Sequence, residues 1–213
     1  MQLRKVLSGL EYKLISGDLD TEITSVEFDS RKVIPGSLFV CVCGFTVDGH
    51  TFATKAIEQG ASAIVADSRR EGFSEEELKA LSGGAAVIEI EDTHKHLADL
   101  SANFYDHPEK KISVFGITGT KGKTTTAFML REILEKSGKN TGLIGTVCNI
   151  IAGEKIHSSH TTPESRELYE MMDKLVKNGS SDLVMEVSSQ ALVNFRISGL
   201  VFDSVIYTNL SPD

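Results

Sequence analysis

The stretch that decides the fold is Ile112-Ser-Val-Phe-Gly-Ile-Thr118, which continues through Gly119-Thr-Lys-Gly-Lys-Thr124 into the helix-forming run Ala127-Phe-Met-Leu-Arg-Glu-Ile-Leu134. An apolar run that passes through a glycine-rich turn into a helix gathers backbone N–H groups and a helix N-terminus around one small concavity. Lys123 adds a cation there, and the Thr124 hydroxyl is an oxygen that can ligate Mg²⁺. The stretch therefore predicts a strand–loop–helix unit that binds ATP and Mg²⁺.

This loop departs from the common phosphate-loop pattern G-x-x-x-x-G-K-[ST] at one position. The first glycine of that pattern would fall at position 117, which is Ile117, and Gly116 and Gly119 flank it. The alternative to nucleotide binding is an ordinary strand–turn–helix junction without a ligand.

Composition restricts the class of protein. The chain has 213 residues, 40% of them hydrophobic and 24% charged, with a net charge of −8. This charge argues against non-specific binding to nucleic acid or to an anionic membrane. Neither a run of ~18 apolar residues nor the apolar core of a signal peptide is present. We therefore expect a cytoplasmic protein with no nucleic-acid or membrane partner. We also expect a monomer, although the composition carries no sign of the oligomeric state.

Apolar runs alternate with helical patterns along the whole chain. Before the polar segment 105–111, strands are predicted at 23–28, 37–42, 61–66 and 86–90, and helices at 52–59, 75–81 and 92–104. After it, strands are predicted at 112–118, 140–147, 182–187 and 202–207, a hairpin at 149–157, and helices ending near 138 and spanning 163–177. This order predicts an α/β fold, with a small N-terminal α/β domain at 1–108 and the first part of a mostly parallel-sheet, phosphate-loop domain at 109–213.

Several polar residues are placed where they could act on a ligand. Glu186 ends a predicted strand and could hold Mg²⁺ together with Thr124; otherwise it is a charged residue at a strand–loop boundary. Thr161 and Thr162 precede a helix, where they could meet an anion or only cap the helix. Arg196 is either an anion contact or a solvated helix residue.

The cysteines and histidines give no strong sign of a metal site. Cys41 and Cys43 lie two residues apart, so we expect both on one face of a strand as small hydrophobic residues. A C-x-C metal pair is the alternative, although no second ligand pair has suitable spacing. The six histidines are predicted to be surface residues without a metal constellation.

Four segments together resemble the Mur ligase family. They are Asp29-Ser-Arg with Pro35-Gly-Ser-Leu-Phe-Val40 and Asp48-Gly-His; Thr118-Gly-Thr-Lys-Gly-Lys-Thr-Thr-Thr126; Thr161-Thr-Pro-Glu164; and Met185-Glu-Val-Ser-Ser-Gln-Ala-Leu192. The family's own phosphate loop has this form, which accounts for Ile117. The phosphate loop alone would fit the wider group that includes the folylpolyglutamate synthetases. The first and last of the four segments restrict the resemblance to the Mur ligases.

The resemblance implies an ATP-dependent, ADP-forming amide ligase of peptidoglycan biosynthesis. Such an enzyme adds the third amino acid, meso-diaminopimelate or L-lysine, to UDP-MurNAc-L-Ala-D-Glu through an acyl phosphate. The family's second Mg²⁺ site, carbamylated lysine, adenine contacts and C-terminal amino-acid-binding domain would follow Asp213. We therefore expect a fragment that has no ligase activity alone.

Site residues can be carried over from the family motifs by position. ATP would be bound by the phosphate loop, namely Thr118, Gly119, Thr120, Lys121, Gly122, Lys123 and Thr124, with catalytic roles for Lys123 on the transferred phosphate and Glu186 beside it. Mg²⁺ would be held by Thr124 and Glu186. UDP-MurNAc would be bound by Ser30, Phe45, Thr46 and Val47 at the uridine end, and by Thr161, Thr162, Ser188, Asn194 and Arg196 at the diphosphate and MurNAc end.

Three positions differ from the family's usual residues. Gln190 stands where histidine is usual, Pro212 stands where arginine is common, and Phe45 replaces a more polar residue. Two alternatives therefore stay open: another Mur or folylpolyglutamate-type ligase, and a non-catalytic protein that binds a nucleotide as a switch.

Overall fold

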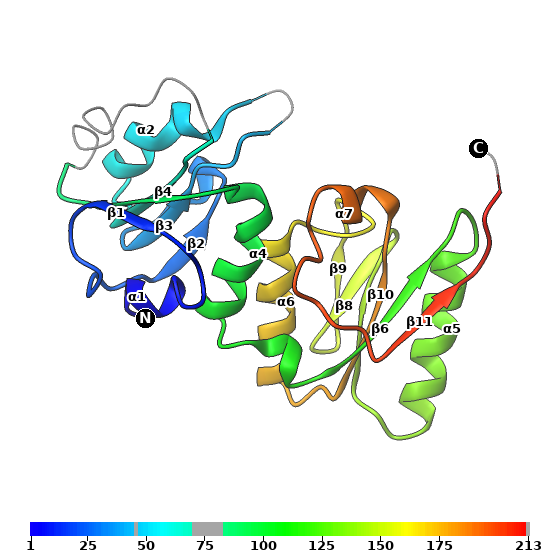
Figure 1. Ribbon diagram of the computed structural model, residues 1–213. Helices are drawn as coiled ribbons and strands as arrows, with labels where there is room; N and C mark the ends of the chain where they lie inside the picture. Colours follow the sequence, from blue (N-terminus) through cyan, green and yellow to red (C-terminus); the bar gives the residue numbers. More distant parts are fainter. Residues whose placement is uncertain (45–46, 70–82, 212–213) are drawn as a thin grey trace. The chain divides into compact units, whose positions relative to one another are not determined.

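The computed structural model describes residues 1–44, 47–69 and 83–211. The chain forms two compact units, Met1–Phe104 and Tyr105–Asp213, and each has its own sheet (Figure 1). The mixed α/β class with mostly parallel sheets is confirmed. The helix predicted at 75–81 lies outside the described residues.

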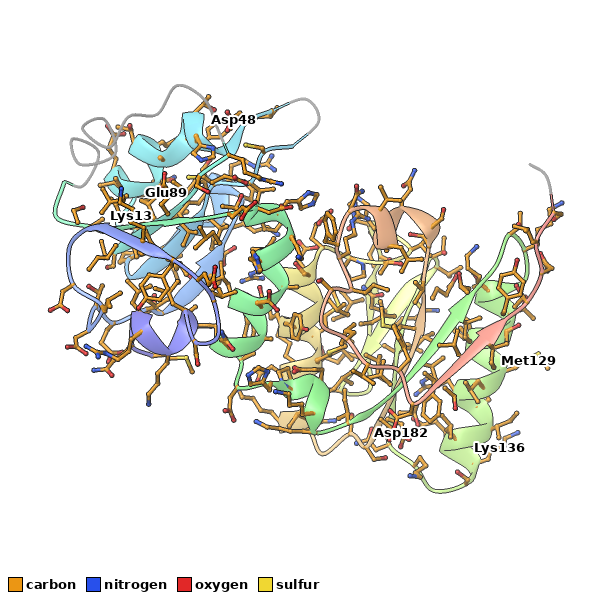
Figure 2. The ribbon with its side chains drawn as sticks, in the orientation of Figure 1. Lys13, Asp48, Glu89, Met129, Lys136 and Asp182 are labelled. Atoms are coloured by element: carbon orange, nitrogen blue, oxygen red, sulfur yellow. The ribbon has the colours of Figure 1, made fainter. Side chains whose placement is uncertain are left out.

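The sheet of the first unit has five strands in the order β1-β5-β4-β3-β2. They are β1 (Lys13–Ser16), β2 (Ser25–Glu27), β3 (Ser37–Val40), β4 (Ala63–Asp67) and β5 (Ala86–Ile90). Strands β2 to β5 are parallel, and β1 runs antiparallel to β5 with Lys13 opposite Glu89 (Figure 2). The edge strand β1 was not predicted, because only one of its four residues is buried and it carries little apolar signal.

Helices cover both faces of this sheet. They are α1 (Leu3–Val6), α2 (Ala53–Glu58) and α4 (Thr93–Phe104), with the 3-10 turns η1 (Ser30–Lys32) and η2 (Gly49–Phe52). Successive side chains of a strand point to opposite faces. In β3, Leu38 packs in one core cluster with Leu97 of α4, whereas Phe39 packs in another with Ala56 of α2.

The sheet of the second unit has six strands in the order β11-β6-β10-β7-β8-β9. They are β6 (Ser113–Thr118), β7 (Thr141–Ile144), β8 (Cys148–Ile151), β9 (Glu154–His157), β10 (Asp182–Glu186) and β11 (Ser204–Tyr207). The first four in this order are mutually parallel, whereas β8 and β9 form the predicted antiparallel hairpin. Ala152 and Gly153 both have positive φ, as a tight hairpin turn requires.

Helices α5 (Lys123–Lys136) and α6 (Ser165–Lys177) lie on opposite faces of this sheet, and the unit also contains η3 (Pro108–Lys110) and α7 (Ser189–Val193) (Figure 1). Ala127 of α5 packs against Ile117, Leu143 and Val184 of the three central strands. Met129 and Lys136 project from α5 away from the sheet (Figure 2). All five residues of β10 are buried, as expected for a strand covered on both faces.

The parallel direction of three neighbouring strands creates the edge on which the candidate site is built. Strand β10 lies between β6 and β7, with Glu186 paired with Ile117 and Met185 with Ile144. The carboxyl ends of all three strands therefore meet at one edge. Open α/β sheets bind ligands at this edge.

The prediction for the two cysteines of the first unit is wrong. Strand β3 ends at Val40; Cys41 is fully buried, whereas Cys43 is exposed. The chain turns after the strand, and Cys43 forms an isolated bridge with Asp48 instead. Within the described part of the chain, no helix combines the length and apolar character needed to cross a membrane.

Candidate active site

The phosphate-loop sequence forms a tight connection between β6 and α5. Gly122 adopts φ +87° at the N-cap of α5, and no side chain caps that helix end. Gly119 has φ +133°, and a Cβ atom at this residue would lie 2.2 Å from Thr208 Oγ1. The backbone conformation at both positions therefore requires glycine. The N-terminus of this 14-residue helix is available to an anion.

Lys123 lies over this loop. Its Nζ donates to the carbonyl oxygens of Gly119, at 2.6 Å, and of Thr120, at 3.2 Å. The ammonium group is thus held at the loop by backbone oxygens rather than by a carboxylate. Its charge remains available to offset that of a bound phosphate.

Glu186 stands at the carboxyl end of β10 and is 1% exposed. Its Oε2 accepts hydrogen bonds from Thr124 Oγ1, at 2.9 Å, and Thr146 Oγ1, at 3.0 Å, whereas Oε1 accepts one from Thr146 N, at 3.0 Å. The structure therefore brings together Thr124 and Glu186, which the sequence had paired as metal ligands. A hydroxyl beside a buried carboxylate, next to a phosphate loop, is an all-oxygen donor set that fits Mg²⁺.

Gly145 makes room for this carboxylate. A Cβ atom at Gly145 would lie 2.3 Å from Glu186 Oε1, so no side chain fits there. Its own N–H donates to Asn149 Oδ1 at 3.2 Å, which fixes the turn that follows β7.

A second group of polar residues surrounds the end of β10. Thr162 is fully buried, and its Oγ1 donates to the carbonyl oxygen of Glu186 at 2.9 Å and accepts from Ser188 N at 3.1 Å. Arg196 Nη1 donates to Thr162 O at 3.0 Å, and its Nη2 pairs with Glu164 Oε1 at 2.6 Å. Thr162, Ser188 and Arg196 are therefore brought together, and their hydrogen bonds tie the loop between β9 and α6 to the strand that carries Glu186.

The other predicted site residues are placed as follows. Thr161 Oγ1 lies 3.0 Å from Thr146 Oγ1. Asn194 is the C-cap of α7, which ends just before it, and Gln190 is exposed on that helix. Their roles toward a ligand stay predictions.

In the first unit, Ser30 begins η1 and is buried, whereas Val47 is 54% exposed. Beside Ser30, a hydrogen bond from the Arg31 side chain lowers the pKa of Asp29, which also caps the turn through Arg31 N. Phe45, Thr46 and Pro212 lie outside the described residues.

Sequence reasoning missed a clasp that residues 208–209 form over the phosphate loop. Thr208 Oγ1 shares its one proton between the carbonyl oxygens of Lys121, at 2.7 Å, and Thr118, at 3.1 Å. Asn209 Nδ2 donates to Lys121 O at 2.9 Å, and Asn209 Oδ1 accepts from Lys121 N at 3.1 Å. The backbone of Lys121 is thus held at both its donor and its acceptor.

Sequence reasoning also missed Thr146, because the predicted strand 140–147 ran through it. The strand ends at Ile144, and the Gly-Thr pair after it is the signal that could have revealed a loop at the functional edge. Small and hydroxyl residues after a parallel strand are typical of such loops.

Cys43, Asp48 and His50 of the first unit are residue types that can bind a metal ion, and their ligand atoms lie close together. Their hydrogen bonds, however, do not fit a metal site. Cys43 Sγ lies 3.7 Å from Asp48 Oδ1 and 3.8 Å from His50 Nδ1. However, His50 Nε2 accepts a hydrogen bond from Asp67 N at 3.0 Å, so the ring proton resides on Nδ1 and is directed to Asp48 Oδ1 at 2.7 Å. No lone pair of Nδ1 faces the cluster. His50 is buried, which corrects the prediction that all the histidines are surface residues.

Comparison with known proteins identifies the class. The family model described as "Mur ligase family, catalytic domain" matches residues 22–105, and that described as "Mur ligase middle domain" matches residues 117–213. The chain therefore belongs to the Mur ligase family, as the resemblance predicted.

Two curated relatives match this chain over its whole length. The chain is 43% identical over 213 residues to UDP-N-acetylmuramoyl-L-alanyl-D-glutamate--2,6-diaminopimelate ligase 1 of Clostridium acetobutylicum, covering 100% of this chain and 42% of that protein. It is 44% identical over 214 residues to the corresponding diaminopimelate ligase of Bacillus licheniformis, again covering 100% of this chain and 42% of the relative. The chain thus spans less than half the length of these curated relatives.

Solved structures support the same fold. A structure of a UDP-N-acetylmuramoyl-L-alanyl-D-glutamate--2,6-diaminopimelate ligase has a TM-score of 0.75 at 20% identity, over 100% of this chain and 41% of the other. MurF from Acinetobacter baumannii has a TM-score of 0.61 at 20% identity, over 88% of this chain and 36% of the other. At this identity the likeness shows the fold alone.

Proposed function

We propose that the protein to which this chain belongs is an ATP-dependent, ADP-forming ligase that joins meso-diaminopimelate to UDP-MurNAc-L-Ala-D-Glu. The choice of substrates is supported by relatives above 40% identity that carry this activity in their names. The observation that carries the proposal is the contact of Thr124 Oγ1 with the buried carboxylate of Glu186 beside the phosphate loop.

This geometry supports the following roles for the residues on the nucleotide side. Residues Thr118 to Thr124 wrap the phosphates of ATP, and Lys123 offsets the charge on the transferred phosphate. Thr124 and Glu186 hold Mg²⁺, which neutralises phosphate charge when bound. The site positions its reactants and stabilises charge without a covalent nucleophile from the protein.

The reaction forms an amide in two transfers. The D-glutamyl carboxylate oxygen attacks the γ-phosphorus and ADP leaves, which gives an acyl phosphate. The amine of diaminopimelate then attacks the acyl carbon and inorganic phosphate leaves. Because the acyl phosphate reacts with water as well as amines, the site must exclude water.

The two parts of the chain divide the substrates between them. In this proposal, residues 1–108 form the UDP-MurNAc-binding domain, with Ser30, Phe45, Thr46 and Val47 at the uridine end. Residues 109–213 form the first part of the ATP-binding domain. On its substrate side, Thr161, Thr162, Ser188, Asn194 and Arg196 meet the diphosphate and MurNAc, and Thr162 and Arg196 also brace one another.

The cellular setting belongs to the same proposal. The protein acts as a monomer in the cytoplasm, with no nucleic-acid or membrane partner, and supplies peptidoglycan synthesis for the cell wall. The net charge of −8 supports the absence of a nucleic-acid partner, and three cysteines without a disulfide support a reducing compartment such as the cytoplasm.

The test is isothermal titration calorimetry with a non-hydrolysable ATP analogue and Mg²⁺. Lys123→Ala removes a charge-assisted hydrogen bond of about 1.5–3 kcal/mol, so affinity falls about 10- to 100-fold. Lys136→Ala, at the far end of the same helix, is the matched control and keeps the wild-type affinity. Equal affinity in Lys123→Ala and wild type would refute the nucleotide role.

A thermal-shift experiment separates the ligase from a nucleotide switch. UDP-MurNAc-L-Ala-D-Glu raises the melting temperature beyond that with the ATP analogue alone if the chain holds both substrates. Stabilisation by the nucleotide only, with no response to UDP or to UDP-MurNAc-L-Ala-D-Glu, would favour the switch or a folylpolyglutamate-type ligase over a Mur ligase.

A further inference from the structure

Thr146 touches both oxygens of the carboxylate that the proposed function assigns to the metal. Its N–H donates to Glu186 Oε1 and its hydroxyl donates to Glu186 Oε2, each at 3.0 Å. The same hydroxyl lies 3.0 Å from Thr161 Oγ1, on the loop between β9 and α6, which the proposed function places on the substrate side. Thr146 itself is an exposed residue between β7 and β8 and contributes nothing to the hydrophobic core.

The direction of these hydrogen bonds follows from counting protons. A threonine hydroxyl carries one proton, and that of Thr146 is donated to Glu186 Oε2. Thr146 must then accept the proton of Thr161, so the bonds run in one direction from Thr161 through Thr146 to Glu186. Thr124 donates to the same oxygen from the nucleotide side. The Glu186 carboxylate therefore accepts hydrogen bonds from hydroxyl groups on both sides of the site.

Thr146 restrains this carboxylate independently of Thr124. If Thr124 and Glu186 serve as metal ligands, a lone pair of Thr124 Oγ1 would bind the ion, so the position of Thr124 would be set by the ion as well as by Glu186. The two donors of Thr146 then remain to fix the rotation of the carboxylate. Groups that orient metal ligands in this way typically contribute 10- to 100-fold to metal affinity.

We propose that Thr146 is a positioning residue that orients the Glu186 carboxylate toward Mg²⁺ and, through the same hydroxyl, fixes the hydroxyl of Thr161 on the substrate side. This inference rests on the proposed function. It assigns to the loop after β7 the task of joining the metal side of the site to the substrate side.

The test measures how the affinity for a non-hydrolysable ATP analogue depends on Mg²⁺ concentration, by calorimetry on the purified chain. Thr146→Val keeps the backbone donor but removes the hydroxyl, so the Mg²⁺ concentration needed for half-maximal binding rises about 10-fold or more. Affinity measured in EDTA stays at the wild-type value. Thr146→Ser restores the hydroxyl and the wild-type Mg²⁺ requirement.

Thr54→Val, an exposed threonine of α2 in the other compact unit, is the matched control and leaves both affinities unchanged. An unchanged Mg²⁺ requirement in Thr146→Val overturns the inference and leaves the proposed function standing. Equal loss of binding with and without Mg²⁺ also overturns it, because that result denotes a structural role. Failure of the wild-type chain to bind the nucleotide at all would instead refute the proposed function.

Discussion

Replacing Gly145 with alanine tests how tightly the buried carboxylate is held. The new Cβ atom would lie 2.3 Å from Glu186 Oε1 and 3.1 Å from its Cδ, whereas ordinary contacts begin near 3.4 Å. The carboxylate must retreat by about 1 Å, which stretches the 3.0 Å bond from Thr146 N beyond hydrogen-bonding distance. An unsatisfied group at a site that is 1% exposed costs about 1–3 kcal/mol. We expect the free energy of unfolding to fall by about 2–3 kcal/mol.

The assay is urea denaturation followed by circular dichroism, together with titration of the ATP analogue with and without Mg²⁺. The matched control is Gly142→Ala on β7, whose Cβ would lie 2.6 Å from a methyl carbon of the buried Leu175. Both variants lose stability, because both introduce a clash. Only Gly145→Ala also loses the Mg²⁺-dependent part of nucleotide affinity. Wild-type stability and wild-type Mg²⁺ dependence in Gly145→Ala would refute the reasoning.

Two further predictions concern the clasp and the acid stability of the first unit. Asn209→Ala removes both side-chain hydrogen bonds to the Lys121 backbone, so we expect the affinity for the ATP analogue to fall about 10-fold. An unchanged affinity, measured by calorimetry, would contradict a role of the clasp in nucleotide binding. Burial raises the pKa of Asp67, but hydrogen bonds from Arg69 and from Thr93 N outweigh it and lower the pKa from 3.8 to about 2. Because the folded-state pKa is the lower one, this stabilisation is present above about pH 4 and is lost as the pH falls through about 2. In urea denaturation, the stability advantage of wild type over Asp67→Asn therefore shrinks by at most about 2 kcal/mol between pH 4 and pH 2, and a gap that stays constant over this range contradicts the assignment.

Much of the fold could be predicted from the sequence, because most strands are buried on both faces. Strand β5 was predicted with its observed bounds, and β10 within one residue, since continuous apolar runs leave little choice of boundary. Three short elements were missed: α7, which has five residues, and α1 and β1, which have four residues each and lie near the N-terminus of the first unit. Such short elements give little local periodicity, and the position of β1 depends on its antiparallel pairing with β5.

The candidate site was predictable where one contiguous motif carries it. The phosphate loop and Lys123 follow from local sequence alone, and Glu186 follows from its place at a strand end. Thr146 and Asn209 could not be found in this way. Their contacts with Glu186 and Lys121 join residues 40 and 88 positions apart, and only the strand order brings them together.

The central claim is that Thr124 and Glu186 hold a metal ion beside a nucleotide bound at residues 118–124. The most direct measurement is a crystal structure of the chain with Mn²⁺ in place of Mg²⁺ and a non-hydrolysable ATP analogue, read by the anomalous scattering of manganese. We predict one anomalous peak in contact with Thr124 Oγ1 and a Glu186 carboxylate oxygen, with phosphate density along the loop. Phosphate density at the loop with the manganese peak away from both side chains, or no phosphate density there, would contradict the account.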